Sequence, residues 1–135
     1  MIDEIINNKK VNCIFVSLET GSYKLYNMMN RPISLEYLIE IIKRIRSERP
    51  DIIIETEIIA GYPGEIIRDI VDTVSLIREL GVYVYEVHEY ENSPLIASSE
   101  LPYQYSHRYK QKIKRYYDRK FNIHNLGILE QCNNS

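Results

Sequence analysis

Three short apolar runs alternate with helix-like segments along this chain, and this alternation constrains the fold more than any other feature. The runs cover residues 12–18, 52–60 and 82–87 and are rich in Ile, Val and aromatic side chains, as buried strands are. After each run, apolar residues recur three or four positions apart, as on one face of a helix. When a crossover helix connects two consecutive strands, the second strand lies parallel to the first. The sequence therefore predicts an α/β fold of three parallel βα units.

Capping residues and charge predict where the helices begin and end. Ser22 is a suitable N-cap for a short helix after the first run. Glu65 is expected to open the helix after the second run, because negative charge is favourable at a helix N-terminus. A basic helix is expected at about 106–124, and the last residues, 126–135, are expected to be frayed. Residues 1–125 then form the folded domain.

Composition excludes several classes of protein. The chain has 135 residues, of which 44% are hydrophobic, and a net charge of −2, as expected for one ordinary globular domain. No apolar run approaches the roughly 20 residues that span a bilayer, and the polar first ten residues do not form a secretory signal, so no membrane contact is expected. Cys13 and Cys132 lie at opposite ends of the sequence and make a poor case for a disulfide framework. A reducing, cytoplasmic setting is the expectation.

Charge is unevenly distributed. Residues 101–135 carry seven basic and two acidic side chains, whereas residues 1–100 carry ten basic and seventeen acidic ones. A basic segment interleaved with tyrosines is compatible with RNA contact through stacking and phosphate pairing. The simpler interpretation is a solvated helix face whose tyrosines dock the helix onto the sheet. The tyrosines concerned are Tyr103, Tyr105, Tyr109, Tyr116 and Tyr117.

Polar residues gather where the three strands are expected to end, at 18–22, 60–65 and 88–94. Ligand sites of parallel α/β folds lie at the carboxyl ends of the strands, so we expect a binding site there. Glu55 and Glu57 share one face of the second strand, because strand side chains alternate. They are expected either to line a polar cavity or to face water. His88 is more often a structural than a catalytic residue in such a position.

Three of these segments resemble the radical S-adenosylmethionine enzymes, most closely the tRNA and ribosomal-protein methylthiotransferases. The sequence LETGS at 18–22, followed by MNR at 29–31, is similar to the first strand end and short helix of that family. TEIIAGYPGE at 56–65 closely resembles the family's TDIIVGFPGE. YENSP at 90–94 is a weaker counterpart of its YSPRPGT, and the resemblance extends over roughly residues 11–120.

The resemblance implies a pocket for S-adenosylmethionine. Backbone groups near Ile59 and Gly61 would meet the adenine, and Glu19 would accept hydrogen bonds from the ribose hydroxyls or bind the amino group. N–H groups beside Ser22, at a helix N-terminus, favour an anion such as the cofactor's carboxylate. The expected cofactor-binding residues are Glu19, Ser22, Glu57, Ile59, Gly61 and Tyr90. No catalytic residue and no metal ligand are expected.

The chain lacks the residues that hold the [4Fe–4S] cluster in this family. Its relatives use three cysteines in a Cys-x3-Cys-x2-Cys loop, and only two distant cysteines are present here. The expectation is therefore the C-terminal half of a partial (β/α)6 barrel, a fragment of a methylthiotransferase-like enzyme that is inactive alone. Two alternatives remain: a stand-alone nucleotide- or anion-binding α/β module, and a non-catalytic partner that completes another chain's barrel.

Partners follow from these expectations. A separate chain with the N-terminal half of the barrel would complete the fold, and RNA would bind the basic helix. The runs at 12–18 and 82–87 carry no charge apart from Glu86, so open sheet edges there predict self-association. Glu19 stands where methylthiotransferases commonly have Gln, which leaves other branches of the radical family open.

Overall fold

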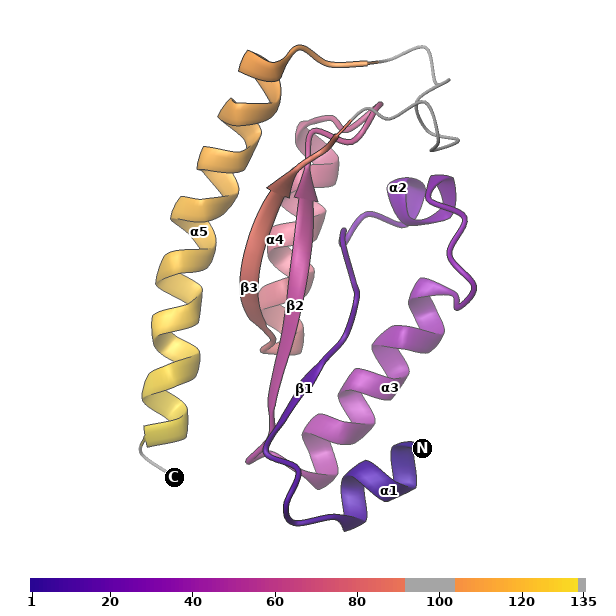
Figure 1. The fold of residues 1–135 in the computed structure, drawn as a ribbon, viewed down its shortest axis with the longest axis vertical. Helices are drawn as coiled ribbons and strands as arrows, with labels where there is room; N and C mark the ends of the chain where they lie inside the picture. Colours follow the sequence, from indigo (N-terminus) through magenta and orange to yellow (C-terminus); the bar gives the residue numbers. More distant parts are fainter. Residues whose placement is uncertain (92–103, 134–135) are drawn as a thin grey trace.

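The fold centres on a parallel sheet, as the sequence predicts. The computed structural model describes residues 1–91 and 104–133. Within these residues the sheet has three strands in the order β1-β2-β3, where β1 is Cys13–Phe15, β2 is Ile53–Ala60 and β3 is Tyr83–Glu89 (Figure 1). Both pairings are parallel. The predicted α/β class with three parallel strands is confirmed, whereas β1 is shorter than the predicted strand at 12–18.

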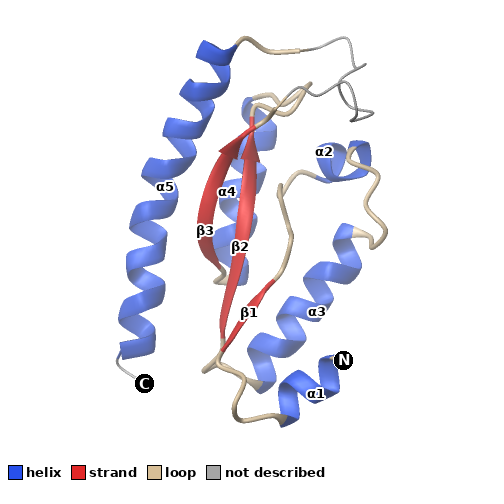
Figure 2. Ribbon diagram, in the orientation of Figure 1, coloured by secondary structure: helices blue, strands red, loops and turns tan. Residues whose placement is uncertain are grey.

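Helices separate and cover the strands (Figure 2). The helices within the described residues are α1 (Ile2–Asn7), α2 (Tyr23–Met28), α3 (Leu35–Glu48), α4 (Ile67–Leu80) and α5 (His107–Asn133). Ile58 of β2 lies in one buried cluster with Ile42 of α3, Val74 of α4 and Phe121 of α5, so these helices cover the same face of the sheet. None of the helices in the described part of the chain has the length and apolarity to cross a membrane.

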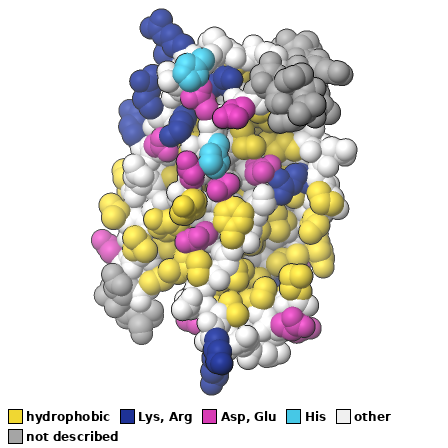
Figure 3. All heavy atoms as spheres, viewed as in Figure 1, with side chains coloured by type: hydrophobic (Ala, Val, Ile, Leu, Met, Phe, Trp, Pro, Cys, Tyr) yellow, Lys and Arg dark blue, Asp and Glu magenta, His cyan; other side chains and the backbone are white. Residues whose placement is uncertain are grey.

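The opposite face of the sheet is open. Side chains along β2 alternate strictly between buried and partly exposed positions. Phe15 and Tyr85 are 53% and 62% exposed, although both are large and aromatic. Figure 3 looks onto this face, where apolar side chains surround a group of acidic residues and histidine. A parallel sheet usually has both faces covered, so one face here is unpartnered within residues 1–91 and 104–133.

A β-bulge in β3 decides which of its side chains reach the open face. Register shifts between Thr56 and Glu57 of β2, so that Glu86 rather than Tyr85 is the Cα partner of Glu57. Beyond the bulge Val87 lies in the core, and His88 pairs with Ile59 on the open face. Bulges commonly redirect side chains in this way beside functional sites.

The outer edge of β3 is covered by α5. The side-chain amide of Asn125 accepts the Val84 N–H at 2.9 Å and donates to the Val84 carbonyl at 2.7 Å. His124 Nε2 lies 2.6 Å from the Val82 carbonyl oxygen. The expected helix end near residue 124 is therefore wrong, because α5 continues to Asn133 along this edge. The edge predicted to be open at 82–87 is paired in part, while self-association stays a prediction.

Candidate functional site

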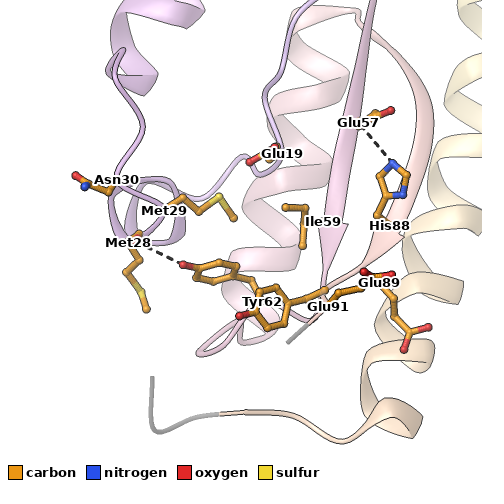
Figure 4. A pocket seen from close by; sticks show the side chains of 11 residues that line it. Glu19, Met28, Met29, Asn30, Glu57, Ile59, Tyr62, His88, Glu89 and Glu91 are labelled. Atoms are coloured by element: carbon orange, nitrogen blue, oxygen red, sulfur yellow. Dashed lines mark hydrogen bonds and ion pairs between the residues drawn. The ribbon is translucent and has the colours of Figure 1, made fainter. Parts of the chain in front are cut away.

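A cavity of about 610 Å³ opens at the carboxyl ends of the strands (Figure 4). Its size falls within the roughly 300–1,000 Å³ that is usual for small-molecule sites. It is lined by side chains from β2, β3, α2 and the segments that follow them, and from the segment after β1: Glu19, Met28, Met29, Asn30, Glu57, Ile59, Tyr62, His88, Glu89, Tyr90 and Glu91. Four of the six predicted site residues meet there, namely Glu19, Glu57, Ile59 and Tyr90.

Glu19 is held in a strained backbone conformation at the edge of the cavity. Its φ is 67°, in the left-handed region that residues other than glycine rarely adopt. Two backbone hydrogen bonds fix it, from the Glu19 N–H to the Glu57 carbonyl at 3.0 Å and from the Ile59 N–H to the Glu19 carbonyl at 2.9 Å. The Glu19 carboxylate forms an ion pair with Arg31. Strained backbone conformations are concentrated at functional sites, and here the strained residue carries the carboxylate of Glu19.

Apolar side chains from α2 and the turn after β2 form the other wall of the cavity. The rings of Tyr62 and Tyr90 meet edge to face, with centroids 5.3 Å apart. Met28 and Met29 lie beside them, and methionine adapts readily to an irregular ligand surface. Lys110 of α5 donates to the Tyr90 carbonyl at 2.9 Å, which ties this wall to the last helix.

The cavity is acidic. Glu19, Glu57, Glu89 and Glu91 all line it, and among the lining residues that the structure describes only His88 is able to carry positive charge. Arg31 neutralises part of this charge through Glu19. A concave site lined by one sign of charge attracts ligands of the opposite sign, so this arrangement favours a cationic ligand.

Gly61 and Glu65 form a buried turn rather than a wall of the cavity. The Gly61 N–H donates to Glu65 Oε1 at 2.8 Å, and Tyr117 of α5 donates to Glu65 Oε2 at 2.6 Å. Burial raises the pKa of Glu65 to about 7, although these two hydrogen bonds oppose the shift. The prediction that Glu65 opens a helix is wrong, because α4 begins at Ile67.

Gly61 has a positive φ of 80°, and a Cβ there would clash with the Lys110 side chain, on the side of α5. The N–H groups of Ile59 and Gly61 are both used by internal acceptors, Glu19 and Glu65. These two N–H groups are therefore not free to meet an adenine ring in this structure, and Ile59 offers the cavity its side chain.

Ser22 is the other predicted residue that does not line the cavity. It is the N-cap of α2, as predicted, and accepts the Leu25 N–H, but its side chain is buried. Its hydroxyl donates to Asp69 Oδ1 at 2.7 Å. Burial alone would raise the pKa of Asp69, but hydrogen bonds from the Ile66 N–H, Lys24 and Ser22 outweigh it and hold that pKa below its usual value. Ser22 thus joins the first strand end to α4.

The structure also adds residues that sequence reasoning did not select. Met28, Tyr62 and Glu89 line the cavity, and Arg31 fixes Glu19. Arg31 and Tyr62 lie inside the motifs that carry the family resemblance. Their position in those motifs could have identified them as candidate site residues. Of the third motif only Tyr90 and Glu91 can be placed, because residues 92–94 lie outside the described part of the chain, as does Tyr103.

The two cysteines do not fit an iron–sulfur cluster at this cavity. Cys13 is the first residue of β1, and Cys132 lies in the last turn of α5, so both are at the opposite end of the strands (Figure 1). A [4Fe–4S] cluster in a cysteine-bound site needs several thiolates near one another. This requirement is not met by the cysteines of this chain.

Comparison with known proteins shows a relationship to methylthiotransferases over half of the chain. The chain is 40% identical over 68 residues, 50% of its length, to the tRNA-2-methylthio-N(6)-dimethylallyladenosine synthase of Clostridium perfringens (strain 13 / Type A). It is 37% identical over 75 residues, 56% of its length, to the protein of the same name from Rickettsia canadensis. These matches span only 15% and 17% of the relatives' own lengths. No family model matches the chain.

Proposed function

We propose that the cavity binds S-adenosylmethionine and that the chain forms one wall of a methylthiotransferase-like radical enzyme that acts on tRNA. The observation that carries this proposal is the convergence of Glu19, Glu57, Ile59 and Tyr90 in one cavity of suitable size. These residues come from three segments separated in sequence, each selected by its resemblance to the family. The relatives named as tRNA methylthiotransferases support the same interpretation.

Each wall of the cavity has a role in this proposal. The Glu19 carboxylate, held by Arg31, accepts hydrogen bonds from ribose hydroxyls. Tyr62, Met29 and Ile59 provide apolar surface for the adenine. Carboxylates on the other side attract the cationic sulfonium and ammonium groups of the ligand. When bound, S-adenosylmethionine supplies the activated sulfonium that the radical family cleaves.

In this proposal the chain contributes binding surface and no catalysis of its own, because its cysteines do not fit the cluster. The open face of the sheet, with Phe15 and Tyr85 exposed, supports a second role in the same assembly. Further strands, from the same polypeptide or from another chain, would cover this face and complete a barrel. The basic helix is proposed to face the RNA, because Lys112, Arg115 and Arg119 line a hollow beside Tyr116.

The binding proposal is tested by titrating the ¹⁵N-labelled chain with S-adenosylmethionine and following amide shifts. We expect shifts confined to residues around the cavity and a Kd in the millimolar range, since a few hydrogen bonds of about 0.5–1.5 kcal/mol each barely offset the entropy of association. Glu19→Ala should weaken binding at least about fivefold, whereas Glu36→Ala, on the exposed side of α3, should not. Shifts remote from the cavity, or equal affinity of the Glu19 variant, would contradict the proposal.

A further inference from the structure

Three potential metal ligands converge on the open face of the sheet, at the margin of the cavity. His88 Nε2 lies 3.3 Å from Glu57 Oε2 and 3.6 Å from Glu86 Oε2. One ligand atom from each residue lies within 4.8 Å of the other two. Figure 4 shows the His88 ring directed at Glu57 across the two strands. The three side chains therefore surround a single point in front of the sheet.

The β-bulge in β3 makes this arrangement. Because Glu86 rather than Tyr85 is the partner of Glu57, Glu86 and His88 both face the side of the sheet on which Glu57 lies. Without the bulge, the alternation of side chains along β3 would place His88 on the buried face of the sheet. Ligands carried by hydrogen-bonded strands are held more firmly than ligands on loops.

The distances suit a shared metal ion better than direct ion pairs. A charged N–H donates to a carboxylate at about 2.7–2.9 Å, which is shorter than either distance from His88. Zinc binds nitrogen and carboxylate oxygen at about 2.0–2.2 Å, and two such ligands of a tetrahedral ion are about 3.3–3.6 Å apart. The separations of 3.3 and 3.6 Å match two edges of that tetrahedron.

The donor set indicates the kind of ion. An imidazole nitrogen suits zinc, copper, nickel or iron, whereas magnesium and calcium prefer oxygen ligands alone. Two carboxylates would compensate the charge of a divalent ion. Glu57, His88 and Glu86 keep 35%, 44% and 52% of their side chains exposed, which leaves room for water on the remaining coordination positions.

We propose that His88, Glu57 and Glu86 form a binding site for a divalent transition-metal ion of the zinc type. Glu57 and His88 also line the cavity, so the open coordination positions of the ion face the space in which a ligand would sit. This site shares Glu57 and His88 with the proposed S-adenosylmethionine pocket, but it is argued from the mutual geometry of three ligands rather than from that pocket. It uses none of the cysteines, and it stands if that pocket fails its test.

The experiment is a calorimetric titration of the full chain with zinc chloride. Cys13 and Cys132 are first replaced by Ser, because free thiols bind zinc. We expect one equivalent of zinc to bind, and His88→Gln or Glu57→Gln to weaken binding at least about tenfold. Glu55→Gln is the matched control, since Glu55 lies two residues from Glu57 on the same face. His107→Gln is a second control, because His107 pairs with a single carboxylate, Glu89.

Two outcomes would overturn the proposal: no zinc binding, or an equal loss of affinity in the Glu55 or His107 variants. If the His88 variant does not fold, the ring nitrogens of His88 are observed by NMR in the chain without cysteines. A metal-dependent shift at Nε2 of His88 then supports the site, and an unchanged His88 ring refutes it.

Discussion

A single buried carboxyl, Glu65, links the turn after β2 to the last helix. It is fully buried and accepts hydrogen bonds from the Gly61 N–H and from Tyr117. Burial is the main cause that raises the pKa of Glu65 from 4.5 to about 7. Burial also raises the pKa of Tyr117, and the neighbouring Glu65 raises it further. Protonation at this one position is therefore coupled to the docking of α5.

This coupling predicts a pH dependence of stability. The folded chain keeps the Glu65 proton up to about pH 7, whereas the unfolded chain loses it near pH 4.5, so the folded state binds more protons in between. Raising the pH through this window should destabilise the wild type by on the order of 3 kcal/mol. Glu65→Gln removes the charge and keeps one acceptor oxygen for the Gly61 N–H, while its NH2 group donates to the Tyr117 hydroxyl. This variant should lose less stability over the same rise in pH. Urea unfolding at pH 5 and pH 8 measures the difference, and parallel losses in both proteins would contradict it.

Gly61 is the other residue whose environment decides the turn. Its φ of 80° and the closeness of the Lys110 side chain to any added Cβ both oppose a substitution. Gly61→Ala should destabilise the fold by about 1–2 kcal/mol, the cost of a left-handed conformation for a residue with a Cβ. Gly127→Ala is the control, because Gly127 lies in α5 with nothing within 4 Å of an added Cβ, and it should stabilise the helix slightly. Thermal unfolding of both variants tests whether Gly61→Ala lowers the melting temperature and Gly127→Ala raises it.

At the scale of elements, apolar periodicity was sufficient to predict the strands, α3 and α4, but not the bulge or the length of α5. Val82, Val84 and Val87 are all buried, and the three-residue step between the last two is the trace of the bulge. Beyond His124 most of the described residues are exposed, and the end of the chain is where fraying is expected. The contacts of Asn125 with β3 hold it in place, and such long-range contacts leave no periodic signal.

Asn125 therefore carries a prediction about the sheet edge. Asn125→Ala removes the partner of both backbone groups of Val84 and should cost about 1–3 kcal/mol, the penalty for leaving such groups unpaired. The freed edge should also increase self-association, because unpaired strand edges template pairing. Asn122→Ala, on the exposed side of the same helix, is the control. Urea unfolding and sedimentation velocity report the two effects, and identical behaviour of the two variants would disprove the role of Asn125.

For the whole molecule, the sequence predicted where the candidate cavity lies better than which residues line it. A site was expected at the carboxyl ends of the strands because parallel sheets bring strand ends together. The family resemblance added Glu19 and Glu57, which line the cavity. Ser22 and Gly61 were expected to line the cavity but do not. Ser22 packs against α4 and Gly61 against α5, and these contacts are not visible in the local sequence. Which carboxylates meet His88 depends on the register of two strands, and that register is set by a bulge that breaks the alternation of buried and exposed side chains.

The whole chain should also fail to assemble an iron–sulfur cluster. Its two thiols lie at the ends of the strands away from the cavity, and a [4Fe–4S] cluster needs at least three convergent ligands of this kind. After anaerobic incubation with iron and sulfide, the desalted chain should be colourless. Any iron that it keeps should be a single ion held by His88, lost in His88→Gln and unaffected by replacement of both cysteines with Ser. About four irons per chain with matching sulfide, lost on cysteine replacement, would show instead that the thiols converge in solution.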